Sequence, residues 1–328
     1  MAARADRYPV ELVDLRSVAA KRLEGLLADE TKHWREELHW DFAPAAELVR
    51  QYVGTSSLNG FALVERTFSV SVVGYGYYVC EGNKALIGDL YVARHSASRE
   101  NEYLLLNALL DELRRTPSVV RVECQLMMLQ NGTERTPVPQ GFPGAETLRS
   151  FGRHFMAASI SDWHAPPALP AGFDVVPWND VWQDETARLI AASYHQHIDS
   201  EINDQYRTPS GARRFVTNIV QYPGCGRFFA PGSLAVVDRA SRSLAGLCLA
   251  SIVSRGVGHI TQICVAPQAQ GKGLGRELLR RSIEALALGG CGEVGLTVTA
   301  SNAPAVKLYE SMGFRKVRSF SANVWDWS

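Results

Sequence analysis

Residues 270–275 read Gln-Gly-Lys-Gly-Leu-Gly, and their types and spacing suit the binding of a phosphorylated ligand. An apolar run, 260–265, leads into them, and an apolar-periodic segment, 276–288, leads out, which predicts a strand, a glycine-rich turn and a helix. The first backbone N–H groups of a helix have no intrahelical acceptor, and glycines let a ligand approach them. Lys272 and Arg276 add positive charge to that of the helix dipole. We therefore expect an anion site at this turn.

The spacing of the glycines excludes two common nucleotide motifs. A P-loop requires Gly-x4-Gly-Lys-Ser/Thr, and this string is missing from the sequence. A dinucleotide fingerprint requires Gly-x-Gly-x-x-Gly, whereas the glycines here stand at 271, 273 and 275. What remains is Gln270-x-x-Gly273-x-Gly275, for which a plain strand-to-helix turn is the simplest alternative.

A second motif follows a further predicted strand, Glu293–Thr299. Residues 302–314 begin with Asn302, a good helix N-cap, continue to a Leu-Tyr pair ending at Tyr309, and close with Gly-Phe. The two motifs, in this order and separated by one helix and one strand, resemble those of the GNAT superfamily of N-acetyltransferases. The resemblance covers roughly residues 230–320.

This resemblance implies acetyl-CoA as a co-substrate, with no metal. The main chain at Ile263, Cys264 and Val265 would hold the pantetheine arm and the acetyl oxygen. The remaining residues that the resemblance assigns to acetyl-CoA are Gln270, Gly271, Lys272, Gly273, Leu274, Gly275, Arg276 and Asn302. Asn302 is interpreted equally well as a helix cap, and Cys264 as a nucleophile or as a buried strand residue.

Two further roles concern proton transfer. The resemblance places Tyr309 beside the sulfur as a general acid, the alternative being a packing role. Many family members carry a Glu on the strand before the turn, at the position where this chain has His259. An imidazole suits a base near pH 7, although a strand-end His that faces solvent is the alternative.

The acceptor amine is expected near residues 194–214. Asp199, Glu201 and Asp204 would bind a cationic amine, and a solvated charged loop is the alternative. His195 and His197 stand two positions apart, so on a helix they would face apart, which argues against a metal site.

The composition of the chain excludes several classes of function. The 328 residues suit two domains, and Lys plus Arg equal Asp plus Glu at 34 each, so the formal net charge is zero. This balance argues against a binder of nucleic acid or of anionic membranes. No apolar stretch reaches a membrane span, and the six cysteines form no CxxC pair, as in a reduced, cytoplasmic protein. We expect a monomer or homodimer.

The chain also contains an internal repeat. Residues 85–92 match 258–265 at an offset of 173 positions, and the helix-like segment 103–115 matches 276–288 at the same offset. A proline-rich segment, 165–170, lies between the halves. The predicted fold class is α/β with two tandem GNAT-like domains, residues 1–165 and 166–328. Each would be a mostly antiparallel mixed sheet flanked by helices.

The two halves are not equivalent. The offset places Ala97, Ser98, Glu100 and Glu102 where the second half has Gln270 and its three glycines, so two carboxylates would repel a pyrophosphate. Residues 131–144 hold three prolines and would not form a Leu-Tyr helix. The first domain is therefore predicted to be degenerate and not to bind the cofactor.

These observations predict an N-acyltransferase that moves an acetyl group to a primary amine of a small molecule or peptide by direct transfer in a ternary complex. A catalytically inactive acyl-CoA-binding sensor is one alternative. A protein that serves only as an interaction module is another.

Overall fold

A computed structural model describes residues 10–66, 70–129, 145–160, 169–222 and 224–327. The chain forms two compact units: unit 1 comprises residues 1–152 and 319–328, and unit 2 comprises residues 153–318. The boundary predicted between residues 165 and 166, and the proline-bearing segment 131–144, lie outside the described residues. The units are described separately below.

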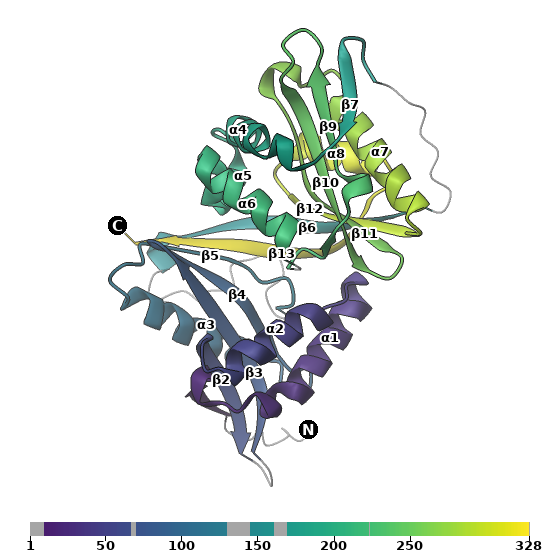
Figure 1. Ribbon diagram of the computed structural model, residues 1–328. Coiled ribbons are helices and arrows are strands. Elements are labelled where there is room, and N and C mark those ends of the chain that lie inside the picture. The colour runs from purple at the N-terminus through teal and green to yellow at the C-terminus, as the bar shows by residue number, and fades with distance from the viewer. Residues whose placement is uncertain (1–9, 67–69, 130–144, 161–168, 223, 328) are drawn as a thin grey trace. The chain divides into compact units, whose positions relative to one another are not determined.

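Unit 1 is a mixed sheet with the strand order β1-β2-β3-β4-β5-β13 (Figure 1). Its strands are β1 (Val10–Asp14), β2 (Asn59–Arg66), β3 (Val70–Glu81), β4 (Lys84–Val92), β5 (Arg121–Gln125) and the end of β13 (Arg315–Asp326). The β4–β5 pair is parallel, and the other pairs are antiparallel. Residues Ala322–Asp326 pair with β5, so the chain's last strand completes the sheet of the first unit.

The helices of unit 1 lie on both faces of this sheet. They are α1 (Glu24–Leu38), α2 (Ala43–Gly54) and α3 (Arg99–Arg114). Helix α3 buries leucines at 105, 106, 109, 110 and 113, the spacing of an apolar helical stripe, against β3 and β4. Helix α1 packs on the opposite face, where Glu30 accepts a hydrogen bond from the Tyr75 hydroxyl.

Unit 2 is a mixed sheet with the strand order β6-β12-β11-β10-β9-β7, and β8 pairs with β10. Its strands are β6 (Leu148–Ser159, of which 153–159 belong to this unit), β7 (Phe173–Pro177), β8 (Arg227–Phe228), β9 (Leu234–Asp238), β10 (Leu244–Ser254), β11 (Val257–Val265) and β12 (Glu293–Thr299). Only the β11–β12 pair of the described pairs is parallel.

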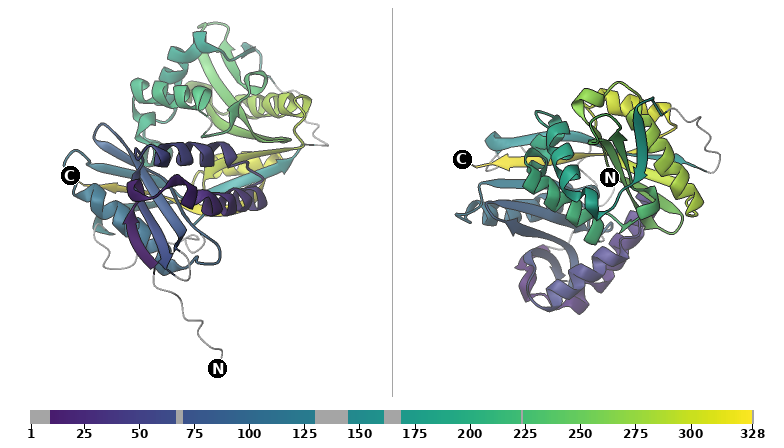
Figure 2. Two further views of the ribbon diagram at one scale, coloured as in Figure 1. Left: turned by 60° about the horizontal axis from the view of Figure 1, so that its bottom comes forward. Right: turned by 45° about the horizontal axis from the view of Figure 1, so that its top comes forward.

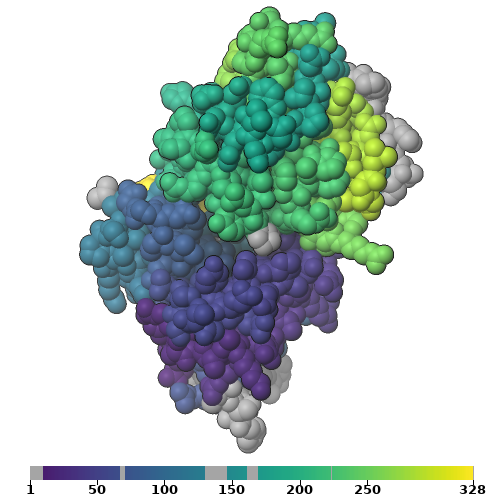
Figure 3. Space-filling view, in the orientation of Figure 1, coloured from purple at the N-terminus to yellow at the C-terminus, as the bar shows by residue number. Residues whose placement is uncertain are grey.

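Helices also cover both faces of the second sheet (Figures 1 and 2). They are α4 (Gln183–Ser193), α5 (Ile198–Ile202), α6 (Pro209–Gln221), α7 (Leu274–Leu288) and α8 (Ala303–Ser311). Helices α4 to α6 form part of the teal and green surface of unit 2 in the space-filling view (Figure 3). Helix α7 packs on the other face, with α8 beside its start. The predicted strand–turn–helix order around residue 270 and the helix after Asn302 are confirmed.

A β-bulge and a divergence of strands create the space for a site in unit 2. In the β10–β11 register Leu249 faces Gln262 and Ala250 faces Ile260, so Thr261 is an extra residue in β11. The parallel pairing of β11 with β12 ends at Ile260 and Leu296. Beyond this point the two strands diverge, and the main chain of β11 from 261 to 265 borders a cavity.

Unit 1 repeats this arrangement. In β4 the extra residue is Gly88, because Asp89 faces Tyr77 and Ile87 faces Tyr78. The parallel pairing of β4 with β5 ends at Ile87 and Cys124. Gly88 and Thr261 are 173 positions apart, the offset found in the sequence. The repeat is therefore confirmed at the level of strand register.

No helix in the described ranges is both long and apolar enough to span a bilayer.

Candidate functional site

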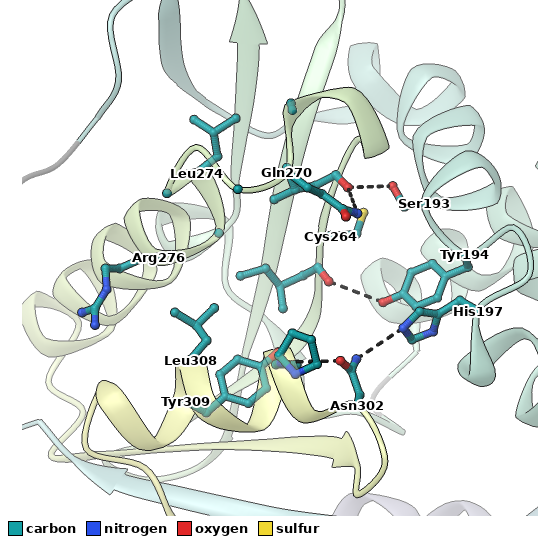
Figure 4. Close-up of a pocket in the computed structure, with 18 residues that line it drawn as sticks. Ser193, Tyr194, His197, Cys264, Gln270, Leu274, Arg276, Asn302, Leu308 and Tyr309 are labelled. Atoms are coloured by element: carbon teal, nitrogen blue, oxygen red, sulfur yellow. Dashed lines mark hydrogen bonds between the residues drawn. The ribbon is translucent and has the colours of Figure 1, made fainter.

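The larger cavity of unit 2, about 610 Å³, opens between the end of α4, the end of β11, the glycine-rich turn and α8 (Figure 4). Its lining residues are Ser193, Tyr194, His197, Ile263, Cys264, Val265, Ala269, Gln270, Gly271, Gly273, Leu274, Gly275, Arg276, Asn302, Pro304, Ala305, Leu308 and Tyr309. All the residues that the sequence assigned to acetyl-CoA lie here, except Lys272. The Lys272 ammonium lies 5.5 Å from the centroid of the Phe173 ring.

The glycine-rich turn presents the N-terminus of α7 to the cavity. Gly271 and Gly273 have φ values of 74° and 83°, a left-handed conformation that favours glycine. Gly273 is the N-cap of α7 and brings no side chain to the N–H groups of the first turn. A Cβ at either glycine would meet no heavy atom within 4 Å, so the open side of the turn is not filled by the protein.

The third glycine acts differently. Gly275 is helical, and a Cβ there would lie 3.7 Å from Val265 Cγ2 and 3.8 Å from Leu308 Cδ2, which are ordinary contacts. Because Gly275 has no side chain, it adds no side-chain atoms to the cavity lining between β11 and α8. Arg276, one residue further on, also lines the cavity, and its Nη2 donates to Ser311 Oγ over 2.8 Å. The helix start and this guanidinium make the mouth of the cavity electropositive.

The carbonyl groups of β11 receive side-chain hydrogen bonds along the cavity. The Tyr194 hydroxyl donates to the Ile263 carbonyl over 3.4 Å. The Val265 carbonyl accepts from Ser193 Oγ over 3.3 Å and from Gln270 Nε2 over 3.2 Å (Figure 4). The main chain of β11 is therefore within reach of hydrogen-bonding groups in the cavity.

Two residues of the second motif, Asn302 and Tyr309, line the larger cavity (Figure 4). Tyr309 is buried on α8, and burial raises the pKa of its phenol well above the ordinary value, so the hydroxyl keeps its proton. Asn302 caps α8 as predicted, because its Oδ1 accepts from the Ala305 N–H over 3.3 Å. The Asn302 Nδ2 lies 3.4 Å from His197 Nε2.

Cys264 lies in the cavity wall as a buried strand residue. Burial raises the pKa of its thiol to about 12. The thiolate, which is the nucleophilic form, is therefore scarce at neutral pH. This environment suits a packing role for Cys264 and not covalent catalysis.

A smaller cavity of about 160 Å³ adjoins the larger one where β11 and β12 diverge. The two cavities share Tyr194, Ile263, Asn302, Ala305 and Tyr309. The other residues that line the smaller cavity are Arg153, Asp199, Tyr206, His259, Ile260, Thr261, Gln262, Leu296, Thr297 and Val298.

His259 lies in the wall of the smaller cavity and does not face solvent. Its ring stacks on Phe155, with the ring centroids 5.9 Å apart. Burial lowers the pKa of His259 to about 4, so the imidazole is neutral at pH 7 but is a weak base.

The segment 194–214, for which a solvated loop was one interpretation, contains α5 and the start of α6. His197 caps α5, since its Nδ1 accepts from the Asp199 N–H over 3.1 Å. Asp199 lines the smaller cavity, whereas Glu201 and Asp204 lie outside the lining of both cavities. Glu201 instead forms an ion pair with Arg207 over 3.5 Å.

Sequence reasoning missed Arg153. This residue of β6 faces Thr299 of β12 in the strand register, and its Nη1 lies 3.3 Å from Asp199 Oδ1. It carries no local motif, and only the pairing of strands distant in sequence brings it to the cavity. Within the described ranges, no group of three or more His, Cys, Asp and Glu side chains is arranged to hold a metal ion.

Comparisons with known proteins agree with this geometry. Residues 192–314 match the model of the acetyltransferase (GNAT) family. The mycothiol acetyltransferase of Kocuria rhizophila is 32% identical over 155 residues, which are 45% of this chain and 48% of that protein. That of Tsukamurella paurometabola is 35% identical over 161 residues, 47% of this chain and 52% of that protein. The chain spans about half or less of these relatives' length.

Solved structures with a similar fold cover almost the whole chain. A GCN5-related N-acetyltransferase from Sphaerobacter thermophilus has a TM-score of 0.68 at 17% identity and covers 98% of this chain and 96% of its own. A tandem GNAT protein from the clavulanic acid biosynthesis pathway has a TM-score of 0.57 at 18% identity and covers 97% of this chain and 98% of its own. Residues 192–314 therefore match the acetyltransferase (GNAT) family, and the whole chain shares the fold of a tandem GNAT protein.

Proposed function

We propose that the protein is an acetyl-CoA-dependent N-acyltransferase that moves an acetyl group to a primary amine by direct transfer in a ternary complex. The observation that carries this proposal is one continuous cavity wall in unit 2. This wall starts at the two left-handed glycines before α7, follows the main chain of β11 and ends at Tyr309. We further propose that residues 166–328 form the catalytic domain and that residues 1–165 do not bind the cofactor.

The residues of the larger cavity fit acetyl-CoA. The N–H groups at the start of α7 and the Arg276 guanidinium would hold the pyrophosphate, because both favour a negative charge at the glycine-rich turn. The polar edge of β11 would hold the pantetheine arm by main-chain hydrogen bonds, in place of the contacts from Ser193 and Tyr194. Acetyl-CoA, when bound, supplies an acetyl group activated as a thioester.

The side chains near the inner end of the cavity suit transfer without an acyl-enzyme. In the overall reaction the amine nitrogen bonds to the acetyl carbon, the carbon–sulfur bond breaks, and one proton moves from the amine side to the sulfur. Tyr309 retains its proton and would donate it, or a hydrogen bond, to the leaving sulfur. Cys264, as a thiol with a pKa of about 12, would remain outside the covalent chemistry.

The amine must lose a proton before it attacks. His259 is our candidate acceptor of that proton: it is neutral at pH 7 and lines the smaller cavity that adjoins Tyr309. With a pKa of about 4 it is a weak base, so much of the deprotonation would come from solvent. We therefore expect the rate to rise with pH as the amine itself loses its proton.

The experiment is a screen of primary amines with acetyl-CoA, in which release of free coenzyme A thiol is measured. The names of the curated relatives place an amine related to mycothiol in the panel beside amino acids, diamines and peptides. Turnover that falls in Tyr309→Phe would support the proposal. Binding of acetyl-CoA with no turnover of any amine would instead favour an inactive acyl-CoA sensor, and no binding would contradict both.

A further inference from the structure

The smaller cavity of unit 2 contains a charge-compensated ion pair. Among its described lining residues, Arg153 and Asp199 are the two whose side chains are charged at pH 7, since burial keeps His259 neutral. Both side chains are largely buried, with 14% and 16% of their surface exposed. A pocket that already balances one positive and one negative charge would bind a ligand of net charge zero at the lowest electrostatic cost.

The geometry of the pair leaves part of each partner available. Arg153 Nη1 donates to Asp199 Oδ1 and to Thr299 Oγ1, each over 3.3 Å. The Thr299 hydroxyl donates to the same Oδ1. In the part of the chain that the structure describes, Nη1 is the only nitrogen of Arg153 that donates, although a guanidinium carries five N–H groups.

The second oxygen of Asp199 takes no part in the bonds from Arg153 and Thr299, which both go to Oδ1. Asp199 Oδ2 lies 3.6 Å from His197 Nδ1, and that nitrogen already accepts the Asp199 N–H. The cavity is therefore lined by a carboxylate and a guanidinium that lie side by side. An ammonium and a carboxylate carried on one carbon would pair with these opposite partners, the ammonium with Asp199 and the carboxylate with Arg153.

We infer that the acceptor is an α-amino acid whose carboxylate is bound by Arg153, and that Arg153 is the specificity-determining residue of the acceptor site. This inference rests on the proposed function, because it names the amine that the same site acetylates. The ammonium binds toward Asp199 and loses one proton to His259 or to solvent. The resulting amine attacks the acetyl carbon, the carbon–sulfur bond breaks, and the second proton that the nitrogen releases passes to the leaving sulfur. A diamine brings a second cation, for which the described lining of the cavity offers no second carboxylate.

The test compares rates for a small neutral amino acid, its carboxamide and a short diamine. The carboxamide keeps the amine and the size but has no negative charge. The wild-type protein prefers the amino acid over both. In Arg153→Gln the ratio of kcat/KM for the amino acid to that for the carboxamide falls about 10- to 100-fold, the value of a hydrogen-bonded charge contact.

The ratio of the two kcat/KM values distinguishes a loss of carboxylate recognition from damage to the fold. A damaged site would lower kcat/KM for both substrates to the same extent and leave the ratio unchanged. Arg188→Gln is the matched control, since Arg188 is an exposed arginine of α4 that lines a separate cavity. Arg153→Lys keeps the positive charge but not the parallel N–H donors of a guanidinium, so we expect it to retain part of the preference for the amino acid. A wild-type protein that acetylates the carboxamide or the diamine equally well, or an unchanged ratio in Arg153→Gln, overturns the inference.

Binding measurements test the inference even if the protein has no transferase activity. Calorimetric titration of the amino acid and its carboxamide into the protein saturated with coenzyme A gives the same comparison without chemistry. Preferential binding of the amino acid that is lost in Arg153→Gln supports the inference even if the proposed transferase activity fails. Equal affinity for the two ligands overturns the inference and leaves the proposed function intact.

Discussion

The start of α7 in unit 2 and the start of α3 in unit 1 follow equivalent strands of the repeat but differ in chemistry. Gly273 caps α7 with no side chain, and the turn is open. Ser98 caps α3, where its hydroxyl accepts from the Asn101 N–H over 3.2 Å. Glu100 and Glu102 follow in the first turn of α3. The protein's own oxygen atoms and carboxylates therefore occupy the helix N-terminus that, in unit 2, is left for a ligand.

The two units also differ in the contacts that their first long helix makes with the bulged strand. In unit 1 the Asp29 carboxylate accepts from the Tyr91 hydroxyl over 2.8 Å, from the Arg94 N–H over 3.2 Å and from Arg94 Nη2 over 2.9 Å. These contacts tie α1 to the end of β4. At the offset of 173, Tyr91 corresponds to Cys264, a much smaller side chain. In unit 1, Tyr91 and its contact with Asp29 therefore occupy the position that borders the cavity in unit 2.

The largest expected effect comes from giving unit 2 the chemistry of unit 1. Gly273→Glu forces a non-glycine residue into a φ of 83° and places a carboxylate at the anion site. A like-charge contact at about 4 Å costs about 4 kcal/mol at an effective dielectric near 20, so we expect acetyl-CoA affinity to fall by about 100-fold or more.

Gly290→Glu is the control for the strain in this variant. Gly290 has a φ of 87°, also in open space, just beyond the other end of α7. We expect it to bind acetyl-CoA like the wild type, as measured by calorimetry. Equal losses in the two variants would mean that backbone strain, and not charge at the glycine-rich turn, explains the effect.

The next effect concerns Tyr309. Tyr309→Phe removes the proton donor but keeps the ring that packs against Phe314, so we expect kcat to fall about 10- to 100-fold with little change in acetyl-CoA affinity. Tyr222→Phe, at an exposed tyrosine, is the control. An unchanged kcat in Tyr309→Phe would assign this phenol to packing alone.

The two units are expected to respond to pH in opposite directions. In unit 1, burial and then the nearby Asp89 raise the pKa of Glu30, so its contribution to stability is present below the ordinary Glu pKa and is lost as pH rises. In unit 2, burial lowers the pKa of His259 from 6.5 to about 4. Its contribution is present above 6.5 and is lost as pH falls through about 4, at a cost of up to about 3 kcal/mol.

Thermal unfolding of variants measures this difference. Glu30→Gln is expected to raise the midpoint by a few degrees at about pH 9, and His259→Gln to reduce the loss of stability near pH 4. Each variant should have little effect in the other range. If Glu30→Gln raised the midpoint in acid and not in base, the raised pKa of Glu30 beside Asp89 would be contradicted.

The smallest expected effect tests whether one substitution can give unit 1 an acetyl-CoA site. Glu100→Gly removes one carboxylate from α3, but the Ser98 cap and the contacts of Asp29 with Arg94 remain. We therefore expect no second acetyl-CoA site by calorimetry. Appearance of a second site in this variant would show that charge alone closes unit 1.

Local sequence patterns predicted the parts of the site that depend on neighbouring residues. The glycine-rich turn, the Asn302 cap and the strand before the turn were predicted because turn chemistry and apolar periodicity are local. The offset of 173 further predicted the repeat, whose matching bulges at Gly88 and Thr261 the structure shows.

Long-range strand pairing determined what the sequence did not reveal. Arg153 reaches the smaller cavity because β6 pairs with β12, and its partner in the register, Thr299, is 146 positions away. The entry of Ala322–Asp326 into the sheet of unit 1 likewise depends on pairing with β5. Neither pairing leaves a pattern in the residues around it, since each strand shows only its own alternation.

The most direct test of the central claim is the stoichiometry of acetyl-CoA binding to the whole chain, with hydrogen exchange to locate the site. We predict one molecule per chain, with protection gained at residues 263–276 and 302–309 and none gained at 89–102. Two molecules per chain, or protection at the start of α3, would contradict the claim that only unit 2 retains the donor site.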